Sequence, residues 1–190
     1  MKQYLVAAIR ILVITLAGTA GAVVVGLLRY GSDVFIPTSP GFAFVSFGFS
    51  CALIFAFYHV RGLSEAITAA VVASAVQFFV ATSYVPRLQA VIFSFGLNLP
   101  VIVVAYLFER RLAALRTFRF VVVSLTYGAM FVLLTLLIGS LSGTAEIPAE
   151  AFRQNFIDGL LLGLGLGIGV EAGEALLHPL EVRTAKEKRA

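Results

Sequence analysis

Six apolar runs, each long enough to cross a bilayer as a helix, occupy most of this 190-residue sequence. An α-helix needs about 20 apolar residues to cross a hydrocarbon core that is about 30 Å thick. The runs lie at residues 4–28, 41–60, 66–85, 88–108, 118–141 and 154–177. They are continuous rather than alternating, unlike the strands of a membrane β-barrel. The sequence therefore predicts an all-α polytopic membrane protein, a bundle of six transmembrane helices.

The composition agrees with this prediction. Hydrophobic residues make up 60% of the chain and charged residues 13%, and the mean hydropathy is +1.00. A soluble domain carries about 25% charged residues. The single cysteine, Cys51, lies inside an apolar run, which excludes an internal disulfide framework and a Cys/His zinc module. We expect one transmembrane domain at residues 1–180 and a basic cytoplasmic tail at residues 181–190.

Positive charges are distributed unequally between the two ends of the predicted helices. Arg29, Arg87 and Arg153 fall on one side, and Arg10 lies inside the first span. The other side holds the remaining ten basic residues: Lys2, Arg61, Arg110, Arg111, Arg116, Arg119, Arg183, Lys186, Lys188 and Arg189. Cytoplasmic loops carry such an excess of Lys and Arg. We therefore expect both termini in the cytoplasm and a plasma membrane of the bacterial inner-membrane type, with no nucleic-acid partner.

Small residues recur at four-residue spacing in the first and last spans. The last span contains Gly159, Gly163 and Gly167, and the first contains Ala17, Gly18, Gly21 and Ala22. Small residues at this spacing let helix backbones approach closely in lipid. We expect the last span to be the central helix of the bundle. The strips indicate close packing within the chain, or else a surface for another membrane subunit.

Few polar side chains lie inside the predicted spans, and each needs a partner, water or a ligand there. They are Gln77 near the middle of the third span, Asn98 at mid-depth in the fourth, and Gln154, Asn155 and Asp158 near the outer end of the sixth. In a compact bundle these side chains can converge on an outward-opening cavity. The apolar loop at residues 30–37 would then cover the cavity, and we expect this loop to pack against the bundle.

A structural interpretation of the same residues stays open. Asn98 and Gln77 would then join neighbouring helices by hydrogen bonds, as polar side chains do in membranes. Asp158 would pair with Arg153 or Arg87 near the outer membrane surface.

A second polar strip lies near the inner end of the last span, where Glu171, Glu174 and His178 share one helix face. Carboxylates and an imidazole are possible metal ligands, but a metal site needs further ligands from another helix. His59, the other histidine, also lies near this end, and Arg10 is a candidate partner for the acidic residues. Salt bridges are the simpler interpretation of this strip. Because no catalytic or nucleotide-binding motif is recognisable, we expect neither enzyme activity nor a cofactor.

Several features of the layout occur together. They are six spans, a first helix rich in small residues, an apolar first outer loop, and a last span that begins Gln154-Asn155-Phe156-Ile157-Asp158. In this combination the chain resembles the substrate-binding S components of energy-coupling factor transporters. The resemblance implies that Ala17, Gly18, Gly21 and Ala22 contact a transmembrane coupling subunit. It also implies a ligand pocket near the outer face that includes Tyr30, Asp33, Asn98, Asn155 and Asp158.

The resemblance implies a function as well. The chain would capture a vitamin-like or metabolite-like molecule from outside, and partner ATPases would drive the transport. One alternative is a structural subunit of a larger membrane complex, which docks through the glycine strips and the loop at residues 109–119. Another is a small ion or proton translocator that uses Asp158 and Glu171. The expected partners are the lipid bilayer, other membrane subunits and a small-molecule ligand.

Overall fold

The computed structural model describes residues 2–35, 39–83, 85–110, 119–141, 143 and 148–187, and no strand occurs among them. The chain forms helices α1 (Lys2–Tyr30), α2 (Ser32–Phe35), α3 (Ser39–Val60), α4 (Leu63–Ala81), α5 (Arg87–Arg110), α6 (Arg119–Leu141) and α7 (Ala149–Glu187). All except the short α2 are long and apolar enough to cross a membrane. The prediction of an all-α chain with six helices able to span a membrane is confirmed.

The helix limits depart from the predicted ones at α4 and α7. We expected α4 to start at residue 66, but it begins at Leu63, because Gly62 adopts a φ of 108° that closes a tight turn after α3. It ends at Ala81, and Pro86 precedes the next helix. Helix α7 continues through Pro179 to Glu187. Most of the predicted tail at 181–190 is thus helical, and residues 188–190 lie outside the described residues.

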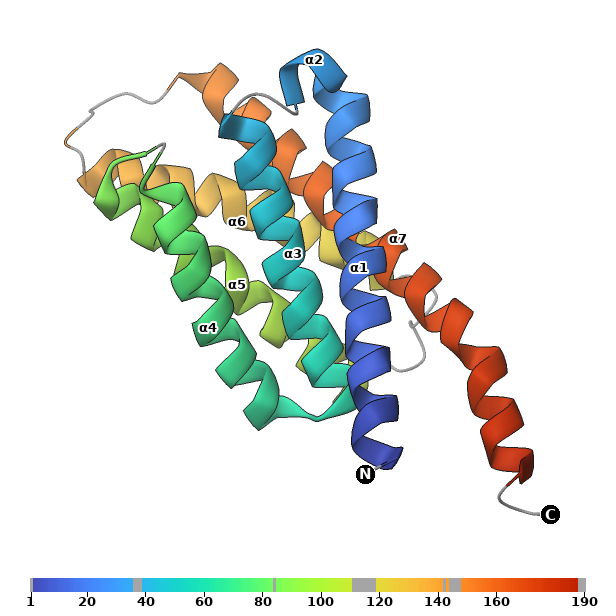
Figure 1. Cartoon of the computed structure of the whole chain (residues 1–190). Helices are drawn as coiled ribbons and strands as arrows, with labels where there is room; N and C mark the ends of the chain where they lie inside the picture. Colours follow the sequence, from blue (N-terminus) through green and yellow to red (C-terminus); the bar gives the residue numbers. More distant parts are fainter. Residues whose placement is uncertain are drawn as a thin grey trace.

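The helices form a closed bundle in which α1 packs between α3 and α7 (Figure 1). Helix α6 packs on the other side of α7, and α4 and α5 complete the ring between α3 and α6. Helix α3 contacts α1, α2, α4, α5 and α7, whereas α7 contacts only α1, α3 and α6 in the part of the chain that is described. Helix α7 nevertheless makes the two most extensive helix–helix contacts of the bundle, with α1 and α6. That the glycine-rich last span is the central helix stays a prediction.

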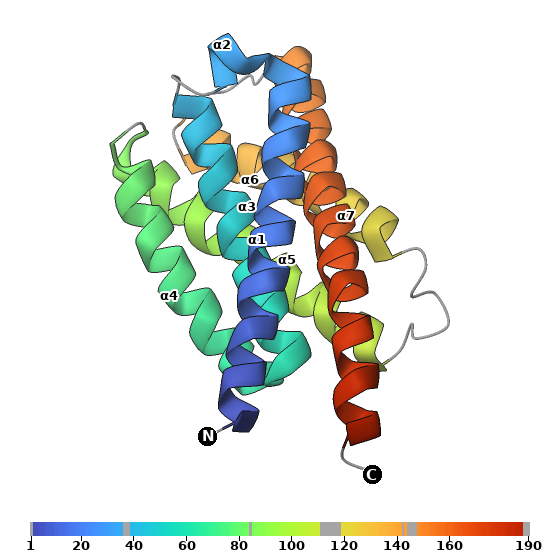
Figure 2. The same ribbon diagram turned by 45° about the vertical axis from the view of Figure 1, so that its right-hand side comes forward.

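Both chain termini lie at the same end of the bundle (Figure 2). We call this the termini end, and we call the opposite end, where α2 lies, the distal end. This placement is the one that an even number of spans requires. Arg29, Arg87 and Arg153 belong to the distal end of their helices. Which end faces the cytoplasm stays a prediction from the distribution of positive charge.

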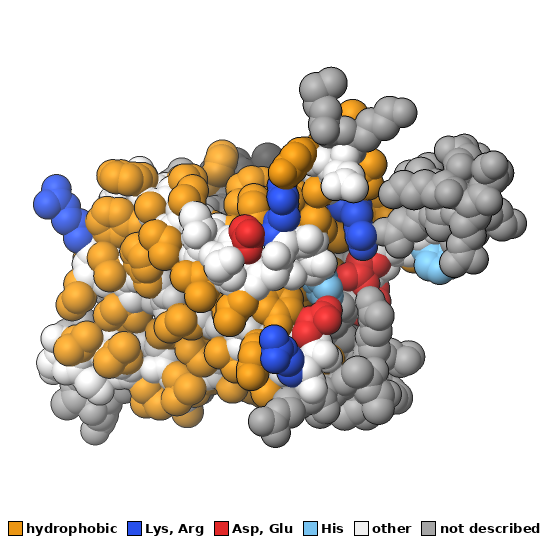
Figure 3. Space-filling view, turned by 90° about the horizontal axis from the view of Figure 1, so that it is seen from below, with side chains coloured by type: hydrophobic (Ala, Val, Ile, Leu, Met, Phe, Trp, Pro, Cys, Tyr) orange, Lys and Arg blue, Asp and Glu red, His pale blue; other side chains and the backbone are white. Residues whose placement is uncertain are grey.

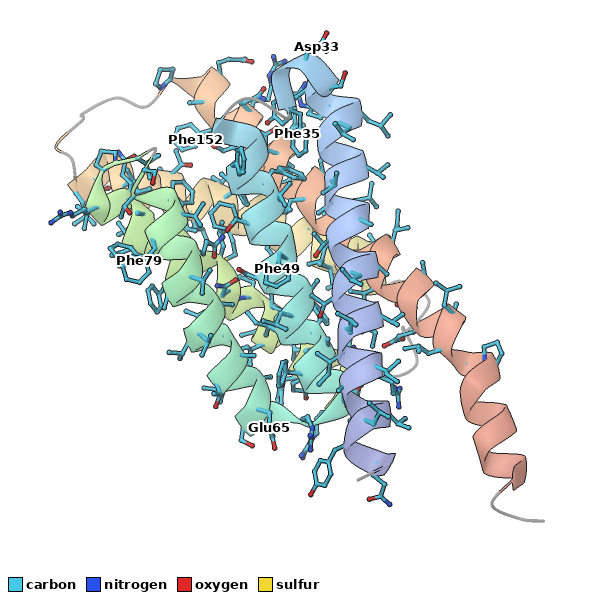
Figure 4. All side chains as sticks on the ribbon, viewed as in Figure 1. Asp33, Phe35, Phe49, Glu65, Phe79 and Phe152 are labelled. Atoms are coloured by element: carbon cyan, nitrogen blue, oxygen red, sulfur yellow. The ribbon has the colours of Figure 1, made fainter. Side chains whose placement is uncertain are left out.

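The outside of the bundle is apolar. Large hydrophobic side chains are exposed on every long helix, including Leu28 at 82%, Phe79 at 71% and Leu176 at 68%. Phe79 points away from the bundle on α4 (Figure 4). Such a surface suits lipid and not water, because soluble proteins rarely expose large contiguous apolar patches.

Of the loop predicted to pack against the bundle, Phe35 does so, whereas Gly31, Ser32 and Asp33 are exposed and residues 36–37 lie outside the described residues. Phe35 is 3% exposed, and its ring lies 6.4 Å from the Tyr30 ring and 5.8 Å from the Phe44 ring. Gly26 faces this ring, so a Cβ at that position would collide with Phe35. Phe35 therefore packs α2 against the distal ends of α1 and α3.

Candidate functional site

Four polar side chains form a cluster that joins α1 to α7 at the distal end. The Asp158 carboxylate lies 3.5 Å from Arg29 Nε, and its side chain is only 16% exposed. Arg29 Nη2 donates a hydrogen bond of 2.9 Å to Gln154 Oε1, and Gln154 Nε2 donates one of 3.3 Å to Asp158 Oδ1. The Tyr30 hydroxyl also hydrogen-bonds with Asp158. The carboxylate is thus satisfied within the chain, by partners on two helices.

The partner of Asp158 differs from both arginines that the sequence suggested. Arg153 instead pairs with Glu150, one turn earlier on α7, at 2.6 Å. Arg29 reaches Asp158 because α1 lies alongside α7. The alternative that named Arg153 or Arg87 is therefore wrong about the partner, although an ion pair does hold the carboxylate.

The other two distal residues predicted for the pocket lie outside this cluster. Asp33 is exposed at the distal tip of the molecule, where its carboxylate accepts a 3.3 Å hydrogen bond from Ser32 (Figure 4). Asn155 donates a 2.8 Å hydrogen bond to the backbone carbonyl of Ala151 on its own helix. The structure brings Tyr30 and Asp158 together and does not bring these two residues to them.

A buried hydrogen-bond network connects α4 and α5 in the middle of the bundle. Asn98 Nδ2 donates to Ser74 Oγ at 2.6 Å, to the backbone carbonyl of Ser94 at 2.9 Å and to Gln77 Oε1 at 3.3 Å. Asn98 and Gln77 are each 1% exposed. The structural interpretation is confirmed for this pair, since they join two neighbouring helices.

The same network extends to α3 and α6 through the single cysteine. The Cys51 thiol donates to Asn98 Oδ1 at 3.7 Å, and the Tyr127 hydroxyl donates to the Cys51 sulfur. Cys51 and Tyr127 are both fully buried. One chain of polar contacts thus links four helices, and no sequence pattern predicts that the cysteine belongs to it.

Asn98 and Asp158 do not meet. Helices α5 and α7 make no contact with each other over their described residues. The five residues predicted for one pocket are therefore divided: Tyr30 and Asp158 lie in the distal cluster, Asp33 lies at the exposed tip, Asn98 lies in the central network, and Asn155 bonds to its own helix.

An apolar cavity opens in the distal half of the bundle, between α3, α4, α5 and α6. Its volume is about 190 Å³, and we call it the distal cavity. The residues that line it include Phe47, Phe93, Phe131, Val80, Val85 and Gln77. The three phenylalanine rings pack against one another with centroids 6.2 to 6.4 Å apart. No charged side chain is among the described residues that line this cavity.

Gln77 belongs to both the central network and the distal cavity. Its Oε1 accepts from Asn98, while its Nε2 is buried and has no hydrogen-bond partner among the described residues. A buried unpaired amide donor costs about 1 to 3 kcal/mol. The surface of the distal cavity is apolar, so this donor lies beneath the cavity wall and not on it.

The predicted small-residue strip of α1 packs inside the chain. A Cβ on Gly21 would collide with the Gly165 carbonyl of α7, and one on Gly18 would lie 2.7 Å from Ala52 Cβ of α3. Ala22 is fully buried, and Ala17 lies against Gly173. We call the contact between α1 and α7 the glycine seam. Gly18 and Ala22 are buried and Ala17 and Gly21 partly buried, so this strip packs mainly within the chain.

The glycines of α7 divide between two neighbours. A Cβ on Gly159 would lie 2.5 Å from the Tyr127 carbonyl oxygen of α6, and one on Gly163 would lie 2.6 Å from Ser124 Cα. Gly167 is buried as well. The Ser124 hydroxyl donates a 2.6 Å hydrogen bond to the Leu160 carbonyl across this contact. The packing interpretation therefore holds for both glycine strips.

A polar cavity of about 700 Å³ lies at the termini end. Its lining includes Arg10, His59, Glu109, Glu171, Glu174 and His178. His59 is 6% exposed, and its Nδ1 lies 3.1 Å from Glu109 Oε1 and 3.5 Å from Glu174 Oε1. Figure 3 looks onto this end and shows acidic, basic and histidine side chains gathered beside a wide apolar surface.

The termini-end cavity brings together the residues of the predicted inner strip, with Glu109 added from α5. In the described part of the chain, no three His, Cys, Asp or Glu side chains are arranged to hold a metal ion. Glu171, Glu174 and His178 thus line a charged cavity without forming a metal site there. The ion pairs of His59 with Glu109 and Glu174 agree with the salt-bridge interpretation.

No protein-family model, curated protein or solved structure matches this chain. The resemblance to S components therefore stays a prediction.

Proposed function

We propose that this chain is the substrate-binding membrane subunit of a small-molecule uptake transporter. The distal cavity carries the proposal, because it is an apolar pocket with aromatic walls between four helices, and small-molecule sites are concave and mostly apolar. The distribution of basic residues favours an orientation with the distal end outside the cell, where an importer receives its substrate. The distal cavity thus replaces the pocket expected around Asn155 and Asp158.

The coupling subunit of such a transporter needs a surface other than the small-residue strip of α1. That strip is buried against α3 and α7. The charged termini end is the surface we assign to the partner, because its ionisable groups lie where cytoplasmic ATPases act.

A cavity-filling variant tests the proposal. Ala43 lines the distal cavity, so Ala43→Leu reduces its volume, while Ala129→Leu adds the same group on an exposed position of α6. We expect native mass spectrometry of the protein purified from its own membranes to detect a bound small molecule. Ala43→Leu should lose this molecule and Ala129→Leu should keep it. Retention of the molecule in folded Ala43→Leu protein would refute binding in the distal cavity.

A proton or cation translocator is the second candidate, because ionisable groups lie at both ends of the α1 and α7 pair. Between these ends the backbones of Gly21 and Gly165 touch, which leaves no room for water along the glycine seam. Proton and potassium flux into liposomes that contain the purified chain separates the two candidates. We expect flux equal to that of empty liposomes; a specific flux would favour the translocator.

A further inference from the structure

His59 lies between two carboxylates that belong to different helices. Its side chain is 6% exposed, and its Nδ1 lies 3.1 Å from Glu109 Oε1 of α5 and 3.5 Å from Glu174 Oε1 of α7. Helices α5 and α7 make no contact with each other over their described residues. The imidazole, which belongs to α3, thus connects two helices whose described backbones lie apart.

This connection depends on the charge of the imidazole. An ionised carboxylate can only accept hydrogen bonds, so Nδ1 of His59 must carry the proton that faces Glu109 and Glu174. A neutral imidazole offers one N–H and no charge, whereas an imidazolium attracts both carboxylates at once. Both carboxylates are therefore held strongly only while His59 is protonated.

The charge of the termini-end cavity acts in the same direction. Its charged and titratable lining residues are Arg10 of α1, His59 of α3, Glu109 of α5, and Glu171, Glu174 and His178 of α7. Helix α4 contributes no charged side chain to the described lining. With both histidines neutral, three carboxylates face one guanidinium, and the formal charge of the lining is −2. A neutral His59 thus leaves the carboxylates of α5 and α7 to repel each other across the cavity.

The two histidines are the groups of this cavity expected to change charge near neutral pH. Imidazole ordinarily titrates between about pH 5 and pH 8, and carboxyl, guanidinium and phenol groups ordinarily titrate outside this range. The phenol ring of Tyr58 packs edge-on against the His59 ring, with centroids 6.3 Å apart. His178 is exposed, whereas His59 lies buried against both carboxylates. A change in the charge of His59 therefore acts directly on the contact between α5 and α7.

We propose that His59 is a pH-sensitive latch, which joins α5 to α7 at the termini end when it is protonated and releases them when it is neutral. The inference goes beyond the proposed function, because it concerns how the bundle moves and not what it binds. Helix α7 forms the glycine seam with α1, and α5 lines the distal cavity. The latch thus joins the helices of the seam to the helices around the distal cavity.

Spin labels on the two helices test the inference. Cysteines replace Leu107 of α5 and Leu176 of α7, which are 37% and 68% exposed near the latch, and the protein without these cysteines shows whether the buried Cys51 takes up label. Double electron–electron resonance in lipid nanodiscs measures the separation of the labels between about pH 5 and pH 8. We expect the separation to increase as the pH rises, by about 1 to 2 Å, the size of a typical helix shift. A second pair, Val91→Cys and Phe156→Cys, reports on the distal parts of α5 and α7 and should keep its separation.

Two histidine variants locate the effect. His59→Gln keeps a side chain that donates a hydrogen bond but cannot be protonated, so the separation should no longer depend on pH. His178→Gln makes the same change at the exposed histidine of this cavity and should retain the pH dependence. Glu109→Gln removes the charge of one carboxylate, which is 47% exposed, and should reduce the shift. This last result does not depend on the folding of the His59 variant.

Each other result contradicts the inference. A separation that does not change with pH while both histidines are present would mean that no latch opens. A shift that survives in His59→Gln, or one that disappears in His178→Gln, would assign the pH dependence to another group. An undiminished shift in Glu109→Gln would remove the contact with α5 from the latch. An equal shift of the distal pair would mean that the whole bundle expands.

Discussion

The glycine seam and the region around the distal cavity hold helices together by opposite means. In the seam, α1 and α7 approach until the Gly21 and Gly165 backbones touch, and no side chain lies between them there. Around the distal cavity, phenylalanine, glutamine and asparagine side chains keep α3, α4, α5 and α6 apart. The seam is closed, whereas the other region contains a cavity and an unpaired donor.

This difference shows where a membrane bundle of this kind can bind a ligand. Lipid gives apolar helices no hydrophobic reason to associate, so close packing and buried hydrogen bonds must stabilise the bundle. The seam provides the close packing. Because the seam is rigid and full, the opposite half can tolerate a cavity and a donor that costs stability. The close packing and the proposed binding site therefore lie in different halves of the molecule.

The largest loss of stability is expected from a substitution that disrupts the glycine seam. A Cβ on Gly165 would lie 2.5 Å from the Gly21 carbonyl oxygen, so Gly165→Leu must push two backbones apart. We expect a loss of about 3 kcal/mol or more in the free energy of unfolding, at the upper limit for overpacking. Unfolding by SDS in mixed micelles, followed by circular dichroism, measures the loss.

Ala172→Leu is the control for this substitution, because Ala172 lies exposed on the same helix. It should leave the unfolding free energy unchanged. Equal stability of the two variants would mean that the seam does not stabilise the bundle.

The next largest loss of stability is expected in the other half of the bundle, in the buried network around Asn98. Asn98→Leu removes the amide that donates to Ser74 and Gln77, and it leaves those buried groups without their partner. We expect a loss of about 2 kcal/mol, because unpaired buried polar groups cost about 1 to 3 kcal/mol each and lipid lowers the value. The same SDS titration measures it. Leu99→Ala, a change on the neighbouring lipid-exposed residue, should cost less; if it costs as much, the network contributes no specific stability.

The sequence alone predicts much of this fold. Apolar runs locate the six long helices because the thickness of the bilayer fixes their length. Phe35 was expected to pack inward, since a loop with several aromatic residues is unusual in water. Gln77 and Asn98 were identified because an amide in the middle of a span needs a partner.

The candidate site was less predictable, for physical reasons. Nothing in the order of residues shows that the first helix lies beside the last, so Arg29 could not be assigned to Asp158. The sequence does not reveal the cavity walls either. Phe93 lines the cavity and Phe79 is exposed on the outside of the bundle, but both are phenylalanines in similarly apolar runs. Only Gln77, a mid-span amide, carried information about the cavity.

A smaller effect concerns the ion pair at the distal end of the seam. Arg29 and Asp158 are 32% and 16% exposed, so their attraction is only partly screened by solvent. A double-mutant cycle with Arg29→Met and Asp158→Leu should give a coupling energy of about 1 kcal/mol. The exposed pair Arg153 and Glu150 is the control and should give no measurable coupling.

The Asp158→Leu protein also distinguishes a structural role of Asp158 from a role in ligand binding. If Asp158 serves the seam, the Asp158→Leu protein should keep the bound small molecule that native mass spectrometry is expected to detect in the unmodified protein. Loss of this molecule at unchanged stability would indicate that Asp158 belongs to the ligand site.

The smallest effect tests how far the central network reaches. Tyr127→Phe removes only the hydroxyl that donates to the Cys51 sulfur, and the ring still fills its fully buried position. Since sulfur is a weak acceptor, we expect a loss of about 0.5 to 1 kcal/mol. Tyr106→Phe makes the same change on the lipid-exposed side of α5 and should have no effect. A loss at Tyr127 alone would show that the buried thiol joins α3 to α6, and equal stability of both variants would confine the network to α4 and α5. In that case the cavity half of the bundle would depend on fewer contacts than its structure suggests, and its contrast with the glycine seam would be greater.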